Sequence, residues 1–328
     1  MTEVNWAVAG MGGAGRGHAE QIAQTAGLHL SGVFDVDPRA AAAAAVERGV
    51  TAYPSMEALL ADPQVQGVSL ATPSALHASE AVRVLESGKH VVIEKPFALN
   101  SDEAQNIANA ARKSDRLALP FHNRRWDPDF RLVLDVVQAG TLGDIRVIRS
   151  AVGGPGPDSG WRLQQNMGGG RLNDWGPHLL SQIYELQGGQ ALSVSGYMTT
   201  VYPQNECDDL FAAEIRFAPS VLVSVMMSGF SYLTPPRWEV IGSEGTLQLT
   251  GELHGEFTLA WKCSDGQQFS QSYRRQDIAQ PIPIYAGIAA HLAGRGELPV
   301  TLEEGMAVSR WLGAIRSSAA AGGIQEKL

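Results

Sequence analysis

The sequence predicts an α/β protein with two regions of different architecture: a doubly wound parallel sheet, then a mainly antiparallel sheet. Over the first 122 residues, short apolar β-branched segments alternate with helical stretches, which is the pattern of βαβ units. Beyond that point, strand-like segments follow one another and several are joined by short turns, as in an antiparallel sheet. We therefore expect one domain over residues 1–122 and a second over residues 123–328.

The strands of the first region read as continuous apolar runs, which is typical of a parallel sheet covered by helices on both faces. We expect these strands at 4–9, 28–34, 52–53, 65–70, 90–93 and 117–121. The helices between them are expected at about 14–26, 38–48, 55–61, 75–87 and 102–114. Pro38 suits the first turn of the second helix.

The second region begins with an amphipathic helix at 127–139 and a strand at 144–152, followed by a Gly- and Pro-rich loop at 153–170. A helix at 177–186 precedes strands at 192–201, 210–217, 221–227, 237–241, 246–250 and 257–261. Two helices, at about 285–293 and 302–320, close the chain. Because proline is tolerated only in the first turn of a helix, Pro177 predicts a helix start near Asp174 or Trp175, with Asp174 as a candidate N-cap.

Composition excludes several classes of protein. The 44% apolar content excludes a mainly disordered chain, and a net charge of −9 disfavours a nucleic-acid partner. The sequence has neither a membrane-length apolar run nor a basic segment with an apolar core at its start, so we expect a cytoplasmic protein without membrane contact. Cys207 and Cys263 lack metal-ligand spacing, which favours free thiols and no metal site.

A glycine-rich segment follows the first expected strand and opens the first helix. It comprises Gly10, Met11, Gly12, Gly13, Ala14 and Gly15, in the spacing G-x-G-x-x-G. Glycines at these places allow a tight turn and close approach of the backbone to a pyrophosphate, while the helix N-terminus supplies N–H groups. A tight turn without a ligand is the alternative, but the strand–turn–helix context favours dinucleotide binding.

Asp35 ends the second expected strand, 20 residues after Gly15. A carboxylate there accepts hydrogen bonds from the adenosine ribose and repels a 2′-phosphate, so NAD is the expected cofactor. Asp35 could instead cap the helix that starts at Pro38, but Asp37 competes for that role. Arg39 could accommodate a 2′-phosphate, which keeps NADP as the alternative cofactor.

Two further sets of residues carry chemistry. Lys95 follows the fifth expected strand directly, where ligands of open α/β sheets bind, although most lysines are merely solvated. Asp174 and His178 are four residues apart, so a helix brings both to one face. A carboxylate beside an imidazole fixes its tautomer and stabilises the imidazolium.

The ordered motifs resemble the Gfo/Idh/MocA family of oxidoreductases, in particular its scyllo-inositol dehydrogenase-like branch. These motifs are GMGGAG, FDVD, ATPSALH, GKHVVIEKP, NRRWDP, GWR, GGGRLNDWGPH and LPVTLEEG, and they cover nearly the whole chain. The resemblance implies an N-terminal Rossmann domain and a C-terminal α/β domain with a large open sheet that forms homodimers or homotetramers. Relatives in that branch tend to use NADP and lack the carboxylate of Asp35.

The resemblance also implies roles for individual residues. His178 becomes the acid/base, oriented by Asp174, and Lys95 positions or polarises the reacting oxygen and precedes a cis peptide bond. The expected cofactor contacts beyond the glycine turn, Asp35 and Arg39 are Thr72, Pro73, Leu76, His77, Glu94 and Asn123. The expected substrate contacts are Lys95, Arg125, Trp161, Arg162, Asp174 and His178.

These observations favour an NAD(P)-dependent dehydrogenase that oxidises a secondary alcohol of a sugar or cyclitol. Two alternatives stay open: an enzyme that retains NAD and cleaves glycosides by transient oxidation, and a nucleotide-binding regulator without chemistry. The presence of Lys95, Asp174 and His178 disfavours the regulator, which needs none of the three. The sequence does not name the sugar.

Overall fold

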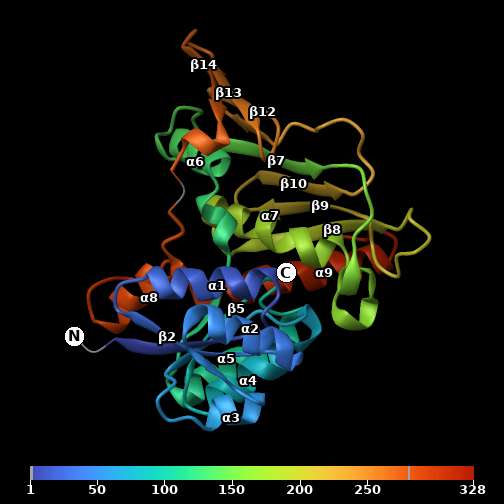
Figure 1. Cartoon of the computed structure of the whole chain (residues 1–328). Coiled ribbons are helices and arrows are strands. Elements are labelled where there is room, and N and C mark those ends of the chain that lie inside the picture. Colours follow the sequence, from blue (N-terminus) through green and yellow to red (C-terminus); the bar gives the residue numbers. More distant parts are fainter. Residues whose placement is uncertain (1–2, 280) are drawn as a thin grey trace. The chain divides into compact units, whose positions relative to one another are not determined.

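A computed structural model describes residues 3–279 and 281–328, which form two compact units (Figure 1). The first unit comprises the chain up to His122 together with Ile282–Ser309, and the second comprises Asn123–Pro281 together with Arg310–Leu328. The units therefore differ from the uninterrupted second domain that the sequence predicted, because the chain returns to the first unit after residue 281.

The first unit is built on a six-stranded sheet in the order β3-β2-β1-β4-β5-β6, and every pair is parallel. Its strands are β1 (Val4–Ala9), β2 (Leu28–Phe34), β3 (Thr51–Ala52), β4 (Gly67–Leu70), β5 (His90–Ile93) and β6 (Ala118–Pro120). The helices are α1 (Gly13–Gln24), α2 (Pro38–Arg48), α3 (Met56–Ala61), α4 (His77–Glu86) and α5 (Ser101–Ser114). The order confirms the doubly wound sheet, whose direction of winding reverses between β1 and β4.

Two late segments complete the first unit: helix α8 (Ile284–Leu292) and the beginning of helix α9 (Leu302–Ala320). Tyr285 and Ile288 on α8 are fully buried. A Cβ on Gly305 would lie 2.9 Å from the ring of Phe97, so α9 packs closely against the segment that follows β5. The sequence predicted both helices, but their periodicity does not reveal the sheet on which they pack.

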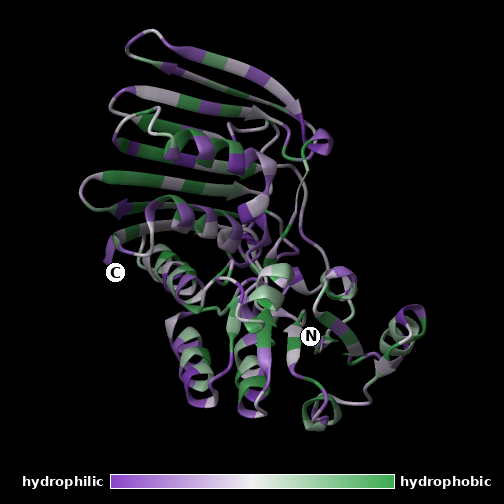
Figure 2. Ribbon diagram, turned by 90° about the vertical axis from the view of Figure 1, so that its left-hand side faces the viewer, coloured by the Kyte–Doolittle hydropathy of each residue, from purple (hydrophilic) through white to green (hydrophobic). Residues whose placement is uncertain are grey.

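The second unit contains a nine-stranded sheet in the order β14-β13-β12-β11-β7-β10-β9-β8-β15. The strands are β7 (Ile145–Gly153), β8 (Ala191–Thr199), β9 (Leu210–Phe217), β10 (Val221–Ser228), β11 (Trp238–Gly242), β12 (Gly245–Gly251), β13 (Glu256–Cys263), β14 (Gln268–Arg274) and β15 (Glu326–Lys327). Among the described strands of this second sheet, only the β7–β10 pair is parallel, which confirms a mainly antiparallel sheet. The alternating hydropathy along its strands is visible in Figure 2.

Helices α6 (Pro128–Gln138) and α7 (Arg171–Gln187) pack against this sheet. Helix α7 begins at Arg171, so the expected start near Asp174 and the role of Asp174 as N-cap were wrong. The N–H groups of Arg171 and Leu172 donate to the backbone oxygen and the carboxylate of Asp208, at 3.0 and 2.8 Å. Asp208 therefore satisfies the first N–H groups of α7 and stabilises a start at Arg171. Pro177, which predicted a later start, lies inside the helix.

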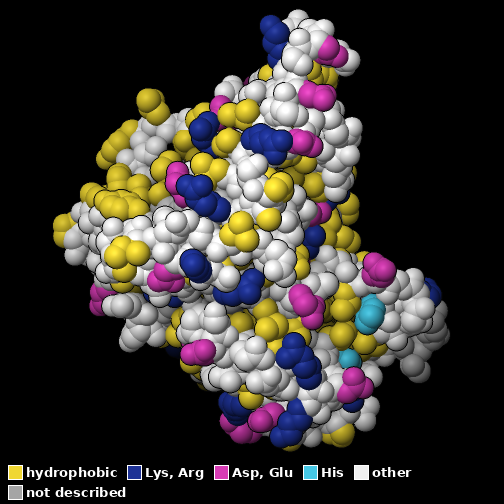
Figure 3. Space-filling view, turned by 180° about the vertical axis from the view of Figure 1, so that it is seen from behind, with side chains coloured by type: hydrophobic (Ala, Val, Ile, Leu, Met, Phe, Trp, Pro, Cys, Tyr) yellow, Lys and Arg dark blue, Asp and Glu magenta, His cyan; other side chains and the backbone are white. Residues whose placement is uncertain are grey.

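Acidic and basic side chains are interspersed on the face seen in Figure 3. No helix within residues 3–279 and 281–328 is both long and apolar enough to cross a membrane. The same residues contain no cluster of three or more His, Cys, Asp or Glu side chains suited to a metal ion.

Candidate active site

The glycine-rich turn links β1 to α1 in a conformation that only glycine allows at its ends. Gly10 has φ +91°, and a Cβ there would lie 2.5 Å from the carbonyl oxygen of Ala71. A Cβ on Gly15 would collide with the carbonyl oxygen of Gly10. By contrast, a Cβ on Gly12 or Gly13 would meet nothing within 4 Å, and no side chain caps α1. The helix N-terminus therefore faces open space, which fits the pyrophosphate of a dinucleotide.

Asp35 is fixed against this turn. Its Oδ2 accepts a hydrogen bond from the N–H of Met11 at 2.6 Å, and its Oδ1 accepts from the N–H of Asp37 at 2.8 Å. Asp37, not Asp35, caps α2 by accepting from the N–H of Arg39 at 3.0 Å. Asp35 is therefore free of the capping role, and its half-buried carboxylate keeps lone pairs for ribose hydroxyls.

We predict that this carboxylate makes NAD the preferred cofactor. Replacing Asp35 with serine removes the repulsion of a 2′-phosphate, so we expect the ratio of kcat/KM for NAD to that for NADP to fall about tenfold or more. The measurement compares both cofactors on one substrate in the wild type and in Asp35→Ser. A wild type that prefers NADP would contradict the argument and would indicate Arg39, whose side chain is 94% exposed, as the phosphate ligand.

The segment after β4 carries the residues expected to pass the cofactor's ribose. His77 is buried, and its Nδ1 and Nε2 lie 2.7 and 2.8 Å from the carbonyl oxygens of Pro96 and Thr72. The ring therefore joins the segments that follow β4 and β5, and His77 stays a predicted cofactor contact. Thr72 donates its hydroxyl to Glu80 at 2.6 Å, and burial raises the pKa of that carboxyl. Pro73 precedes the short 3-10 turn Ser74–Leu76, and Leu76, the last residue of that turn, is exposed.

Glu94 and Lys95 lie directly after β5. The Lys95–Pro96 peptide bond is cis, as the resemblance implied. The Oε2 of Glu94 accepts from the N–H of Lys95 at 2.9 Å. Burial acts to raise the pKa of Glu94, but the hydrogen bond with His18 and the charge of Lys95 outweigh it and hold this pKa below its ordinary value.

Helix α7 positions the predicted acid/base pair in the second unit. His178 is 6% exposed and lies one turn after Asp174. The Oδ1 of Asp174 accepts from the Nε of Arg162 at 3.2 Å, and the Arg162 guanidinium lies 4.8 Å from the centre of the Trp161 ring. The predicted residues Trp161, Arg162 and Asp174 therefore form a connected group in this unit.

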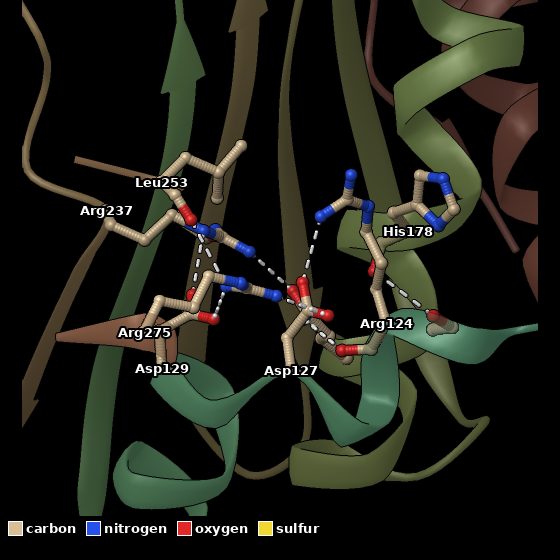
Figure 4. A network of polar contacts seen from close by, with 10 residues as sticks. Arg124, Asp127, Asp129, His178, Arg237, Leu253 and Arg275 are labelled. Carbon is tan, nitrogen blue, oxygen red and sulfur yellow. Dashed lines mark hydrogen bonds and ion pairs between the residues drawn. The ribbon is translucent and has the colours of Figure 1, made fainter. Parts of the chain in front are cut away.

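Sequence reasoning missed two neighbours of His178. The Trp175 ring meets His178 edge-on at 5.7 Å, and the Arg124 guanidinium lies 4.6 Å from the centre of the Trp175 ring. Figure 4 shows Arg124 and His178 together. Both missed residues belong to motifs that were recognised, NRRWDP and DWGPH, so the spacing of Trp175 next to His178 was a usable signal.

Arg125, a predicted substrate contact, forms an ion pair within the second unit. Its Nε donates to Glu185 at 2.8 Å, and Arg131 donates to the other oxygen of the same carboxylate at 2.9 Å. Glu185 is seven residues after His178, which is about 10 Å along the helix. The ion pair joins the 3-10 turn Asn123–Trp126 to α7. Arg125 stays a predicted substrate contact, and Asn123, at the start of the same turn, stays a predicted cofactor contact.

Comparison with known proteins decides the family. Residues 4–122 match the model described as an oxidoreductase family with an NAD-binding Rossmann fold, and residues 130–248 match the GFO/IDH/MocA C-terminal domain. The chain belongs to the Gfo/Idh/MocA oxidoreductase family. Its first unit thus contains an NAD-binding Rossmann domain.

Three relatives illustrate the similarity. The uncharacterized oxidoreductase YdgJ of Escherichia coli is 30% identical over 231 residues, which cover 70% of this chain and 66% of YdgJ. The scyllo-inositol 2-dehydrogenase (NADP(+)) IolW of Bacillus subtilis is 26% identical over 287 residues, which cover 80% of this chain and 79% of IolW. The structure of an NAD-binding protein from Listeria innocua has a TM-score of 0.87 at 28% identity and covers 99% of this chain and 97% of its own.

Proposed function

We propose that the protein is an NAD-dependent dehydrogenase that oxidises a secondary alcohol of a sugar or cyclitol to a ketone. The observation that carries this proposal is the position of His178, buried one turn after Asp174 on a helix whose first turn is fixed by Asp208. A buried imidazole one helical turn from a carboxylate suits a group that must take a hydroxyl proton at neutral pH.

The residues of each unit have separate tasks in this proposal. The N–H groups from Gly12 to Gly15 bind the pyrophosphate, and Asp35 accepts from the ribose hydroxyls. Bound NAD supplies the acceptor for the hydride that leaves the carbinol carbon. His178 takes the hydroxyl proton of the same carbon, Asp174 orients His178, and Lys95 polarises the oxygen.

The proposed substrate class rests on the side chains around His178 in the second unit. Arg124, Trp161, Arg162 and Trp175 offer two guanidinium groups and two aromatic faces. Hydroxyl groups can accept from the guanidinium N–H groups, while an indole ring covers a C–H face of a sugar ring. The similarity to IolW, named as a scyllo-inositol dehydrogenase, supports the same class.

We predict turnover of inositols or aldoses with NAD and little turnover of simple alcohols. A polyol satisfies the polar groups of the site, whereas butan-2-ol leaves them unpaired, which disfavours it by about 10⁴ or more. A spectrophotometric screen for NADH covers inositol isomers, aldoses, sugar acids and butan-2-ol. Butan-2-ol activity equal to that of the best polyol would contradict the proposal. A much faster sugar acid or phosphate would redefine the substrate as an anion that binds the arginines.

We further propose that the protein works in the cytoplasm as a homodimer or homotetramer through its C-terminal sheet. Buried and less buried residues alternate along β9 and β10, so one face of the sheet is less buried than the other. This less buried face supports the proposal, because a second copy of the chain could cover it. No nucleic-acid or membrane partner forms part of the proposal.

A further inference from the structure

A chain of buried polar groups in the first unit takes no part in the mechanism above, yet it ends on Glu94. The indole Nε1 of Trp6 donates to the hydroxyl of Ser69 at 2.9 Å, and that hydroxyl lies 2.6 Å from the hydroxyl of Tyr285. The Tyr285 hydroxyl lies 2.6 Å from Nδ1 of His18, and the Nε2 of His18 lies 3.2 Å from Oε1 of Glu94.

The donors and acceptors along this chain fix its direction. The indole N–H of Trp6 only donates, so Ser69 accepts from it. At the other end an ionised Glu94 only accepts, so Nε2 of His18 donates to it. With one ring proton, on Nε2, the Nδ1 of His18 accepts from Tyr285, whose hydroxyl in turn accepts from Ser69.

The rigidity of the chain comes from its burial. Trp6, Ser69 and Tyr285 are 0–1% exposed and His18 is 1% exposed, so water does not compete for these bonds. The His18 ring also packs edge-on against Phe121, with the ring centres 4.3 Å apart. The side chain of Glu94 is 13% exposed, so the chain opens toward solvent at this carboxylate.

We propose that His18, held by Tyr285, keeps Glu94 as a fixed carboxylate that favours the oxidised nicotinamide over the reduced one. The inference rests on the proposed function: Glu94 directly precedes Lys95, which that function assigns to the reacting oxygen, so Glu94 is taken to lie at the nicotinamide end of the cofactor. The oxidised ring carries a positive charge and the reduced ring carries none, so only the oxidised ring is attracted by a carboxylate. His18 acts through Glu94 and is a positioning residue.

The charged groups that face Glu94 come from two directions. His18 reaches it from α1, and Lys95 follows it in the chain, while Tyr285 on α8 acts one bond further away through His18. With His18 removed, burial is opposed only by the charge and the backbone N–H of Lys95, so the pKa of Glu94 rises. The fraction of Glu94 that is protonated then has to release its proton as NAD⁺ binds, which NADH does not require.

Calorimetric titration of NAD⁺ and NADH into wild type and His18→Leu at pH 7 tests this. We expect His18→Leu to raise the Kd of NAD⁺ about tenfold and that of NADH about twofold at most. The heat of NAD⁺ binding should become dependent on the ionisation enthalpy of the buffer. His18→Gln keeps a donor near the Nε2 position and should restore the wild-type ratio, and His29→Leu, at an exposed histidine, is the control.

Glu94→Gln should reproduce the loss of NAD⁺ affinity without the buffer dependence, and adding His18→Leu to it should cause little further loss. If His18→Leu does not fold, His18→Asn replaces it, because it keeps the bond from Tyr285 but withdraws the donor from Glu94. Equal losses of NAD⁺ and NADH affinity, or an unchanged ratio, would overturn the inference. A wild type that binds NAD⁺ but oxidises no polyol would instead overturn the proposed function.

Discussion

Replacing His178 with alanine is expected to lower kcat by about 10²–10⁴, which is the usual contribution of a positioned acid or base. The variant loses the group that takes the hydroxyl proton, while the glycine turn and Asp35 stay intact. The Kd of NAD should therefore stay within about twofold of the wild-type value. Steady-state kinetics on the best polyol and a calorimetric titration of NAD measure the two quantities.

Two further variants test whether the loss of kcat comes from the acid/base pair. Asp174→Asn should lower kcat in the same direction, because it removes the charge that orients and stabilises the imidazole. His29→Ala, at an exposed histidine of β2, should leave both quantities unchanged. A large loss of NAD affinity in His178→Ala would mean that His178 is structural, and unchanged kcat would remove it from the mechanism.

Much of the fold could be predicted because the local signals agree with the tertiary structure. The parallel sheet, its helices and the glycine turn follow from periodicity and from residues such as Pro38 and Gly10. The allocation of residues 282–309 to the first unit could not be predicted, since it depends on contacts of Tyr285 and Gly305 with distant segments. Strand β14 was missed because its residues are mostly polar and exposed.

In the candidate site, too, local features could be predicted from the sequence and distant contacts could not. The competition between Asp35 and Asp37 was predicted from their distance to Pro38, and the structure gives the cap to Asp37. The predicted start of α7 was wrong because Asp208, which is remote in sequence, satisfies the first N–H groups of the helix. The partner of Arg125 is likewise set by tertiary structure, since Glu185 lies 60 residues away.

The second unit also contains a buried cluster of charges that the sequence did not reveal (Figure 4). Asp127 pairs with Arg124 and Arg275, and Asp129 pairs with Arg237 and Arg275. Arg237 is 5% exposed and also donates to Gln182 on α7 at 2.7 Å. Gln182 in turn donates to the carbonyl oxygen of Arg124 at 2.8 Å, so the cluster links the residues next to His178 to the sheet.

Asp129→Asn is expected to lower the free energy of unfolding of the second unit by about 3–5 kcal/mol, because it leaves a buried guanidinium without its carboxylate. Arg124 and Arg275 would keep their ion pairs with Asp127, whereas Arg237 would lose the ion pair that it forms with Asp129. Burial already lowers the pKa of Arg237, and the charge of Asp129 is the largest effect opposing it. Urea unfolding followed by tryptophan fluorescence measures the loss, with Trp238, next to Arg237, as one reporter.

The matched control is Glu256→Gln, which breaks an ion pair with Arg274 whose two side chains are 69% and 64% exposed. Since exposed pairs contribute about 0–1 kcal/mol, this variant should unfold nearly as the wild type does. A loss of less than about 1 kcal/mol in Asp129→Asn would contradict the prediction. Such a small loss is what breaking an exposed ion pair costs, so it would mean that Arg237 is solvated. If Asp129→Asn has normal stability but a lowered kcat, the cluster instead serves to orient Arg124 beside Trp175.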